Sequence, residues 1–176
     1  MFIPTTPAEV RRLGWDSLDV ILVSGDTYTD NSYNGSAVIG HWLIDHGFRV
    51  GMIAQPRLDS DEDILRLGHP ELFWSVSAGC VDSMVANYTP TNRRRKDDDF
   101  TPGGVNDRRP DRACIAYTNL IKKHSKGRLV VLGGIEASLR RVAHYDAPTF
   151  RLIEHLHNNG EPRGFPQAAR FHFSPF

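Results

Sequence analysis

The stretch DVILVSGD, residues 19–26, decides the fold class. Its apolar run is rich in β-branched side chains and ends at a glycine, which is typical of a short strand buried on both faces. Similar runs follow at residues 48–54, 72–78 and 129–133, with helix-patterned segments between them. Because strands that alternate with helices form parallel sheets covered on both faces, the sequence predicts an α/β domain. We expect a Rossmann-like three-layer α/β/α fold with a mostly parallel sheet.

The helices of this fold are expected where apolar residues recur at helical spacing or where capping residues begin a segment. These segments cover residues 36–46, 60–67, 82–88, 110–126 and 135–144. Gly47 suits the left-handed position that follows a helix. The segment 89–110 holds prolines, adjacent glycines and dense charge of both signs, which is typical of a long loop that is functional or disordered. Within it, the run of basic and acidic residues at 93–99 favours a solvated loop or a docking surface for another domain.

The composition excludes several classes of protein. The chain has 176 residues with 21 basic and 21 acidic side chains, so its balanced charge gives no general attraction to nucleic acid. No apolar run reaches the roughly 18–20 residues of a membrane span, and no signal peptide is recognisable at the N-terminus. We therefore expect a cytoplasmic protein with no nucleic-acid or membrane partner. Its two cysteines, Cys80 and Cys114, are expected to be small buried residues, and a single disulfide between them is the alternative.

A candidate cofactor-binding pocket lies where the first and fourth strands end, if those strands lie close together. Open α/β sheets bind ligands beyond the carboxyl ends of their strands. The candidate residues are Gly25, Asp26, Tyr28, Asp30, Gly133, Gly134 and Glu136. The alternative is structural, because glycines make tight turns and aspartates cap them. Glu136 in the first turn of a helix would oppose an anionic ligand, which argues against a phosphate site.

A second candidate group is Arg140, Arg141 and His144, which the sequence places on or beside one helix. Arg140 and His144 are four residues apart and are expected to share a helix face. The group forms a candidate docking or anion patch, since arginine binds carboxylate and phosphate through two parallel hydrogen bonds. An internal salt-bridge patch remains the alternative. No histidine has a partner at a metal-ligand spacing, so no metal site is predicted.

Five blocks of sequence resemble the N-terminal region of YgiQ-type radical SAM proteins. They are LGWDSLDVILVSGDTYTD, HGFRVGMIAQP, DDDFTPGG, RPDRACIAYTNLIKK and LGGIEASLRRVAHYD. The resemblance runs over roughly residues 9–146 and implies a cobalamin-binding-like Rossmann domain. It also implies a [4Fe–4S] cluster and S-adenosylmethionine, held by a C-x-x-x-C-x-x-C motif in a later barrel domain. That motif is absent from this sequence, so no cofactor is expected in this chain. Residues 26–30 also lack the histidine that ligates cobalamin in related domains.

The resemblance divides the chain into residues 1–146, a Rossmann-like N-terminal domain, and residues 147–176, a divergent tail. The tail is expected to be disordered or to come from a truncated or frameshifted reading frame. The favoured function is a substrate- or cofactor-facing accessory domain whose partner is the missing radical SAM barrel, with no catalysis by this chain alone. The alternative is a stand-alone module for a small ligand, nucleotide or corrinoid-like. An independent hydrolase built on Asp26, Asp30, Glu136 and His144 ranks third, because no nucleophile motif is present.

Overall fold

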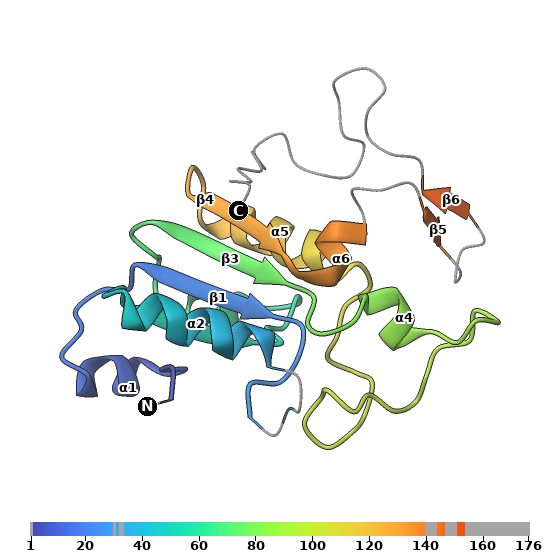
Figure 1. Ribbon diagram of the computed structural model, residues 1–176, viewed down its shortest axis with the longest axis horizontal. Helices are drawn as coiled ribbons and strands as arrows, with labels where there is room; N and C mark the ends of the chain where they lie inside the picture. The colour runs from blue at the N-terminus through green and yellow to red at the C-terminus, as the bar shows by residue number, and fades with distance from the viewer. Residues whose placement is uncertain (1, 30, 32–33, 140–143, 147–150, 154–176) are drawn as a thin grey trace.

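Four parallel strands form the centre of the computed structural model, which describes residues 2–29, 31, 34–139, 144–146 and 151–153 (Figure 1). They are β1 (Val20–Ser24), β2 (Val50–Ala54), β3 (Phe73–Ser77) and β4 (Leu129–Gly133). The order in the sheet is β2-β1-β3-β4. The predicted strands and their parallel pairing are therefore confirmed. The first and fourth strands are not neighbours, since β3 lies between them and pairs with both.

The helices surround this sheet close to their predicted positions. They are α1 (Pro7–Arg12), α2 (Gly35–Asp45), α3 (Glu62–Leu65), α4 (Ser83–Asn87), α5 (Ala113–His124) and α6 (Gly134–Leu139). Side chains cap the N-termini of α2 and α4. Asn34 accepts a hydrogen bond from the amide of Ala37 in α2, and Asp82 accepts one from the amide of Met84 in α4. No helix among the described residues is long and apolar enough to cross a membrane.

The prediction of one helix over residues 135–144 is wrong at its C-terminal end. The described helix α6 ends at Leu139, and His144 begins β5 (His144–Asp146). This strand pairs antiparallel with β6 (Arg151–Ile153). Only four residues separate the two strands, but strands of three residues are too short to show an alternating pattern in the sequence.

Two apolar cores lie on opposite faces of the sheet. On the α5 side, Ile21, Trp74 and Val130 pack among α5 residues that include Tyr117 and Ile121. On the α2 side, the core is smaller. Its buried members are Ile3, Val20, Leu22, Val50 and Met52, with Leu43 and Ile44 of α2 packed against them. The core on the α5 side thus extends across all four strands, whereas α2 covers mainly β1 and β2.

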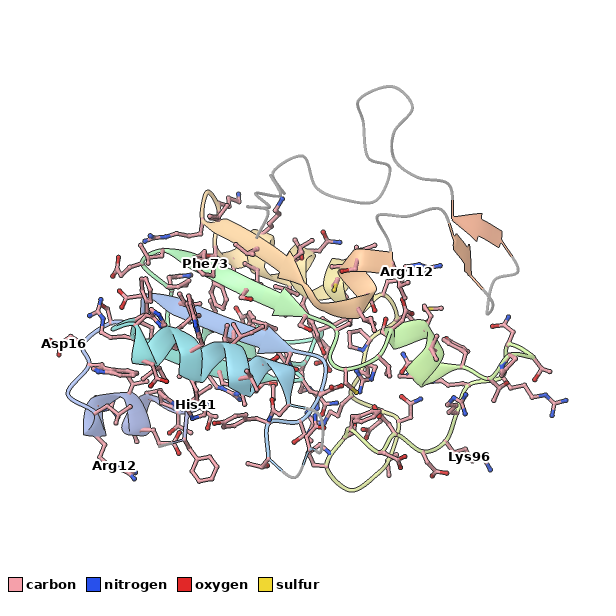
Figure 2. The ribbon with its side chains drawn as sticks, in the orientation of Figure 1. Arg12, Asp16, His41, Phe73, Lys96 and Arg112 are labelled. Carbon is pink, nitrogen blue, oxygen red and sulfur yellow. The ribbon has the colours of Figure 1, made fainter. Side chains whose placement is uncertain are left out.

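The α2 side of β3 and β4 is open. Burial alternates along both strands, whereas every residue of β1 is buried. Leu129 and Val131 keep 48% and 42% of their surface exposed, and Phe73 is half-buried beside them on β3 (Figure 2). In Figure 1 α2 lies in front of β1, while no described helix lies in front of β3 and β4. Within the described part of the chain, one half of this sheet face therefore has no cover of the kind that parallel strands usually have.

Candidate functional site

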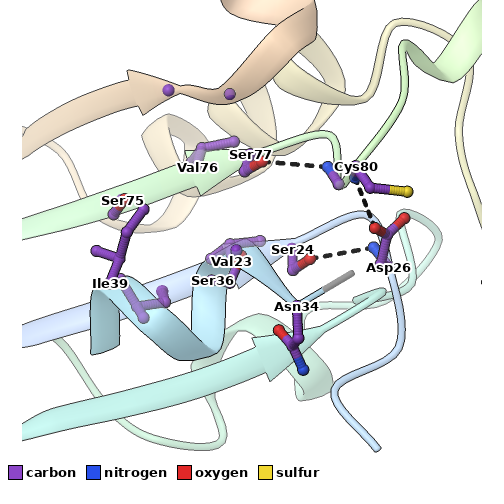
Figure 3. A pocket seen from close by; sticks show the side chains of 15 residues that line it. Val23, Ser24, Asp26, Asn34, Ser36, Ile39, Ser75, Val76, Ser77 and Cys80 are labelled. Atoms are coloured by element: carbon purple, nitrogen blue, oxygen red, sulfur yellow. Dashed lines mark hydrogen bonds between the residues drawn. The ribbon is translucent and has the colours of Figure 1, made fainter. Parts of the chain in front are cut away.

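A pocket of about 140 Å³ lies at the carboxyl ends of the strands, on the α2 side of the sheet (Figure 3). Its lining is rich in small and polar residues from the strand ends and from the first turn of α2. The polar and glycine lining residues are Ser24, Asp26, Asn34, Gly35, Ser36, Ser75, Ser77, Gly79, Cys80, Gly133 and Gly134. Parallel topology explains this position, because the carboxyl ends of all four strands meet at one edge of the sheet.

Hydrogen bonds fix the polar groups of this pocket. Ser24 Oγ accepts a hydrogen bond from the amide of Asp26 at 3.1 Å, and Ser77 Oγ accepts one from Gly79 at 3.1 Å. The amide of Cys80 donates to Asp26 Oδ2 at 2.6 Å, which links the loops after β1 and β3. Each serine hydroxyl also carries a proton of its own that it can donate. The pocket therefore offers hydroxyl donors at fixed positions.

Close backbone approach explains the glycines at two of these strand ends. A Cβ atom on Gly25 would collide with the carbonyl group of Ala78, and one on Gly79 would collide with the Asp26 carboxylate. Gly79 also has a φ of 108°, a conformation that L side chains rarely adopt. By contrast, a Cβ on Gly133 would meet nothing within 4 Å. Gly25 and Gly79 are structural, while Gly133 leaves open space in the pocket.

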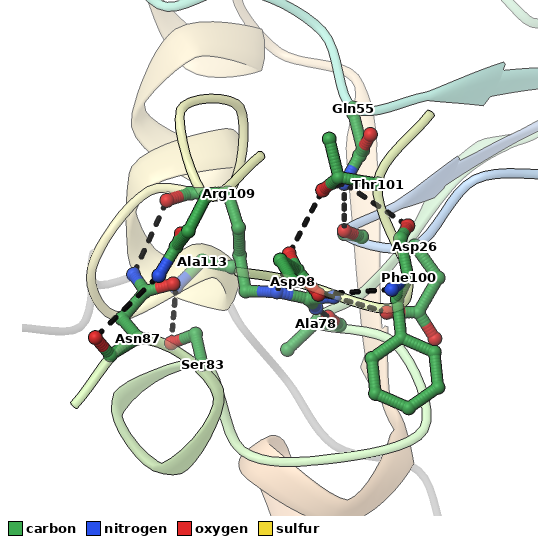
Figure 4. A network of polar contacts seen from close by, with 12 residues as sticks. Asp26, Gln55, Ala78, Ser83, Asn87, Asp98, Phe100, Thr101, Arg109 and Ala113 are labelled. Atoms are coloured by element: carbon green, nitrogen blue, oxygen red, sulfur yellow. Dashed lines mark hydrogen bonds and ion pairs between the residues drawn. The ribbon is translucent and has the colours of Figure 1, made fainter. Parts of the chain in front are cut away.

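A buried arginine holds the carboxylate at the back of the pocket (Figure 4). Arg109, 1% exposed, places Nη2 2.7 Å from Asp26 Oδ1 and donates through Nε to Asp98 Oδ2 at 3.2 Å. Its Nη1 donates to the carbonyl oxygen of Ala78 at 2.7 Å. Burial alone would lower the pKa of the guanidinium, but the two carboxylates outweigh it and raise that pKa. Asp26 is therefore an ion-paired carboxylate that shares one cation with Asp98.

Asp98 completes this network from the long charged loop. Burial raises the pKa of its carboxyl, but hydrogen bonds from the Phe100 amide, Arg109 and Thr101 prevail and hold the pKa below its ordinary value. Gln55 Nε2 donates to Thr101 Oγ1 at 2.7 Å and to the Gly25 carbonyl at 3.0 Å. The loop is thus pinned to the ends of β1 and β2. The prediction of a solvated run over residues 93–99 fails for Asp98, and Arg109 of the same long loop is buried beside it. The length of the loop was the only signal of their role.

Glu136 is fully buried and serves the starts of two helices. Its Oε2 accepts from the amide of Ser83 at 2.8 Å, in the first turn of α4. Its Oε1 accepts from the amide of Cys114 at 3.0 Å, in the first turn of α5. A carboxylate there satisfies amides that have no partner within their own helix and complements the helix dipoles. Glu136 does not line the pocket, so its contacts are structural.

The structure brings only part of the predicted site together. Asp26, Gly133 and Gly134 line the pocket. The Tyr28 hydroxyl instead accepts from the amide of Ile3 at 2.9 Å and so anchors the N-terminal segment. Asp30 lies outside the described residues.

The second candidate group, the docking or anion patch, is largely untested. Arg140 and Arg141 lie outside the described residues. His144 is on β5 and not on α6, so the expected shared helix face with Arg140 does not exist. A role for these residues stays a prediction.

The cysteines do not fit an iron–sulfur cluster. Burial, followed by the Asp26 charge, raises the pKa of the Cys80 thiol to about 11. Burial and Glu136 raise the pKa of Cys114 further, and Cys114 is fully buried. Cluster ligands are thiolates, which both surroundings disfavour. Among the described residues, no group of three or more histidine, cysteine, aspartate or glutamate side chains is placed to hold a metal ion.

The sheet, its helices and the pocket at the strand ends define a Rossmann-like α/β domain with a small polar pocket. The sequence matches the family described as "Radical SAM N-terminal" over residues 2–153, and the chain belongs to that family.

Relatives named as UPF0313 proteins are much longer than the part that this chain matches. One from Fusobacterium nucleatum is 61% identical over 153 residues, which is 86% of this chain and 27% of that protein. One from Thermotoga maritima is 61% identical over 146 residues, or 83% and 26%. One from Methanosarcina acetivorans is 56% identical over 145 residues, or 82% and 20%. The chain spans about a quarter of the length of these relatives. No solved structure matched the chain.

Proposed function

We propose that this chain is the substrate- or cofactor-facing N-terminal accessory domain of a YgiQ-type radical SAM protein. One observation carries the proposal: a preformed polar pocket opens at the strand ends on the side of the sheet that is only half covered. Binding sites in proteins are frequent at domain interfaces. The resemblance implies that the cluster and S-adenosylmethionine supply the radical elsewhere, and this chain contributes no ligand to either.

The chemistry of the pocket favours a small polar group that accepts hydrogen bonds. Serine hydroxyls and the first turn of α2 face it, and the Asp26 carboxylate is already ion-paired with Arg109. Ligand pockets for drug-sized molecules are usually about 300–1,000 Å³. A volume of about 140 Å³ is too small for this pocket to enclose a whole nucleotide or corrinoid. We expect the pocket to hold one end of a substrate whose remainder lies toward the barrel.

A pocket-filling substitution tests this function. Gly133→Leu adds a side chain where a Cβ meets no neighbour, so it fills the pocket without disturbing the core. The substitution is introduced into a chimera, in which residues 1–153 of this chain replace the matching part of the Fusobacterium nucleatum relative. The chimera is given the small-molecule fraction of a cell extract, and stimulated cleavage of S-adenosylmethionine is measured.

We expect stimulation to be lost in Gly133→Leu, while iron content and unstimulated cleavage stay unchanged. Val105→Leu, an exposed loop position, is the matched control and should behave as the parent chimera does. Equal stimulation of the parent and Gly133→Leu would exclude the pocket from substrate binding. A cytoplasmic location stays a prediction, which cell fractionation tests.

A further inference from the structure

The open half of the sheet face has the composition of a buried surface. The strand β4 reads Leu-Val-Val-Leu-Gly, an uninterrupted apolar run of the kind that parallel strands show when both faces are covered. Val130 and Leu132 are buried toward α5, yet Leu129 and Val131 are 48% and 42% exposed on the other face. The sequence of β4 therefore suits a neighbour that the described residues do not supply.

The helix beside this open half presents apolar side chains as well. Ile39 and Trp42 of α2 are 53% and 58% exposed. Ile39 also lines the strand-end pocket together with Ser75 of β3, whose side chain lies on the same face as Val131 (Figure 3). The pocket thus adjoins the open half of the sheet, with Ile39 and Ser75 at the boundary. Exposed apolar surface that adjoins a polar site is typical of an interaction site.

We propose that this surface, formed by Leu129 and Val131 of β4 with Ile39 and Trp42 of α2, is the docking surface for the polypeptide that follows residue 153 in the longer relatives. Docking there places that polypeptide over the mouth of the strand-end pocket. The inference rests on the proposed function, because it names the face on which the accessory domain meets the rest of the protein.

The longer relatives contain enough further polypeptide to occupy the docking surface. The match accounts for only 27% of the Fusobacterium nucleatum protein, so nearly three quarters of that protein is available to cover the surface. The described chain leaves β4 through α6, whose Ile135 and Leu139 are also exposed. A covalently attached segment acts at a high effective concentration, about millimolar for short flexible linkers, and so outcompetes a second copy of the chain.

Cysteine labelling of the 176-residue chain and of the chimera tests the docking face. Val131→Cys reports on the proposed surface, while Val105→Cys and Val85→Cys report on exposed positions elsewhere. Alkylation rates are measured peptide by peptide with mass spectrometry, so that native cysteines do not interfere. We expect Val131→Cys to react freely in the 176-residue chain and at least about tenfold more slowly in the chimera, where reaction needs local opening. Val105→Cys and Val85→Cys should react equally in both proteins.

The other outcomes separate the two proposals. Protection of Val105→Cys or Val85→Cys without Val131→Cys would place docking elsewhere and overturn this inference, while the accessory-domain function would stand. No protection at any position would show that the domain does not dock, and would count against both. Slow reaction of Val131→Cys in the 176-residue chain that depends on protein concentration would assign the surface to a second copy. Slow reaction independent of concentration would assign it to this chain's own tail, and both results would overturn the proposal.

Discussion

Replacing Arg109 by methionine tests the buried network behind the pocket. Methionine keeps much of the volume of the arginine side chain but removes the cation that is ion-paired with both Asp26 and Asp98. The guanidinium is fully buried and lies 2.7 Å from Asp26 and 3.2 Å from Asp98, so both carboxylates would stay buried without a partner charge. Removing one partner from a buried ion pair costs about 3–5 kcal/mol. For a domain of this size, each kcal/mol of lost unfolding free energy lowers the melting temperature by about 2–4 °C. We therefore expect the melting temperature to fall by about 6–20 °C.

The stability lost in Arg109→Met should also depend on pH, and the direction of this dependence follows from the pKa of the Asp98 carboxyl. Its pKa is lowered in the folded parent protein, so it contributes stability above its unfolded pKa, and this is lost as the pH falls through the folded value. In Arg109→Met, burial without the cation raises the pKa of the Asp98 carboxyl, and protonation then relieves its uncompensated charge. The difference in unfolding free energy between parent and variant should therefore shrink between about pH 7 and pH 4.

Urea denaturation followed by circular dichroism at several pH values measures both effects. Arg108→Met is the matched control, because Arg108 is the adjacent arginine but is exposed. Its effect should stay within about 0.5 kcal/mol, as for most surface substitutions. The reasoning would be refuted if Arg109→Met cost no more than Arg108→Met, or if its cost did not change with pH.

Three further predictions concern other buried groups. Glu136→Gln removes a charged acceptor shared by two helix starts, and urea denaturation should show a loss of about 1.5–3 kcal/mol; an unchanged midpoint would contradict this. Gly25→Ala should lower the unfolding free energy by about 1–3 kcal/mol, because the added Cβ collides with the Ala78 backbone. Gly35→Ala, whose Cβ has no neighbour within 4 Å, should raise the unfolding free energy by about 0.4–1 kcal/mol. Equal effects of the two variants would exclude the close approach of Gly25 to Ala78. Anaerobic reconstitution with iron and sulfide should give no stable cluster, and alkylation of Cys80 should stay slow until the pH nears 11; a stoichiometric cluster, or fast alkylation at neutral pH, would contradict the two expectations.

The strands were predictable because their signal is local. Each is a short apolar run that ends near a glycine or a polar residue, and burial in a parallel sheet requires no more than that. The strand-end rule then placed Asp26, Gly133 and Gly134 at one site. The same rule wrongly placed Glu136, two residues beyond Gly134, in the pocket, whereas its carboxylate accepts hydrogen bonds at the starts of α4 and α5. That difference depends on where two helices begin in space, and neither start is visible in the pattern around Glu136.

The network around Arg109 was beyond prediction for a related reason. Arg109 and Asp98 lie in a segment dense in charges of both signs, where most of the side chains are exposed. Composition describes the segment as a whole and therefore predicts solvation. Burial of these two residues depends on the loop folding back across the strand ends, where Gln55 bonds Thr101 and the amide of Thr27 donates to the Phe100 carbonyl.

The same network determines how the pocket can respond to a ligand. Asp26 lines the pocket, yet its carboxylate is held by Arg109 on one side and by the Cys80 amide on the other. Any movement of Asp26 toward a ligand would have to break a buried ion pair, at a cost of about 3–5 kcal/mol that a small polar ligand would need to offset. Binding should therefore leave the strand-end loops in place. The adaptable part of the site is its open side, next to Ile39 and Val131, where the pocket has no described cover.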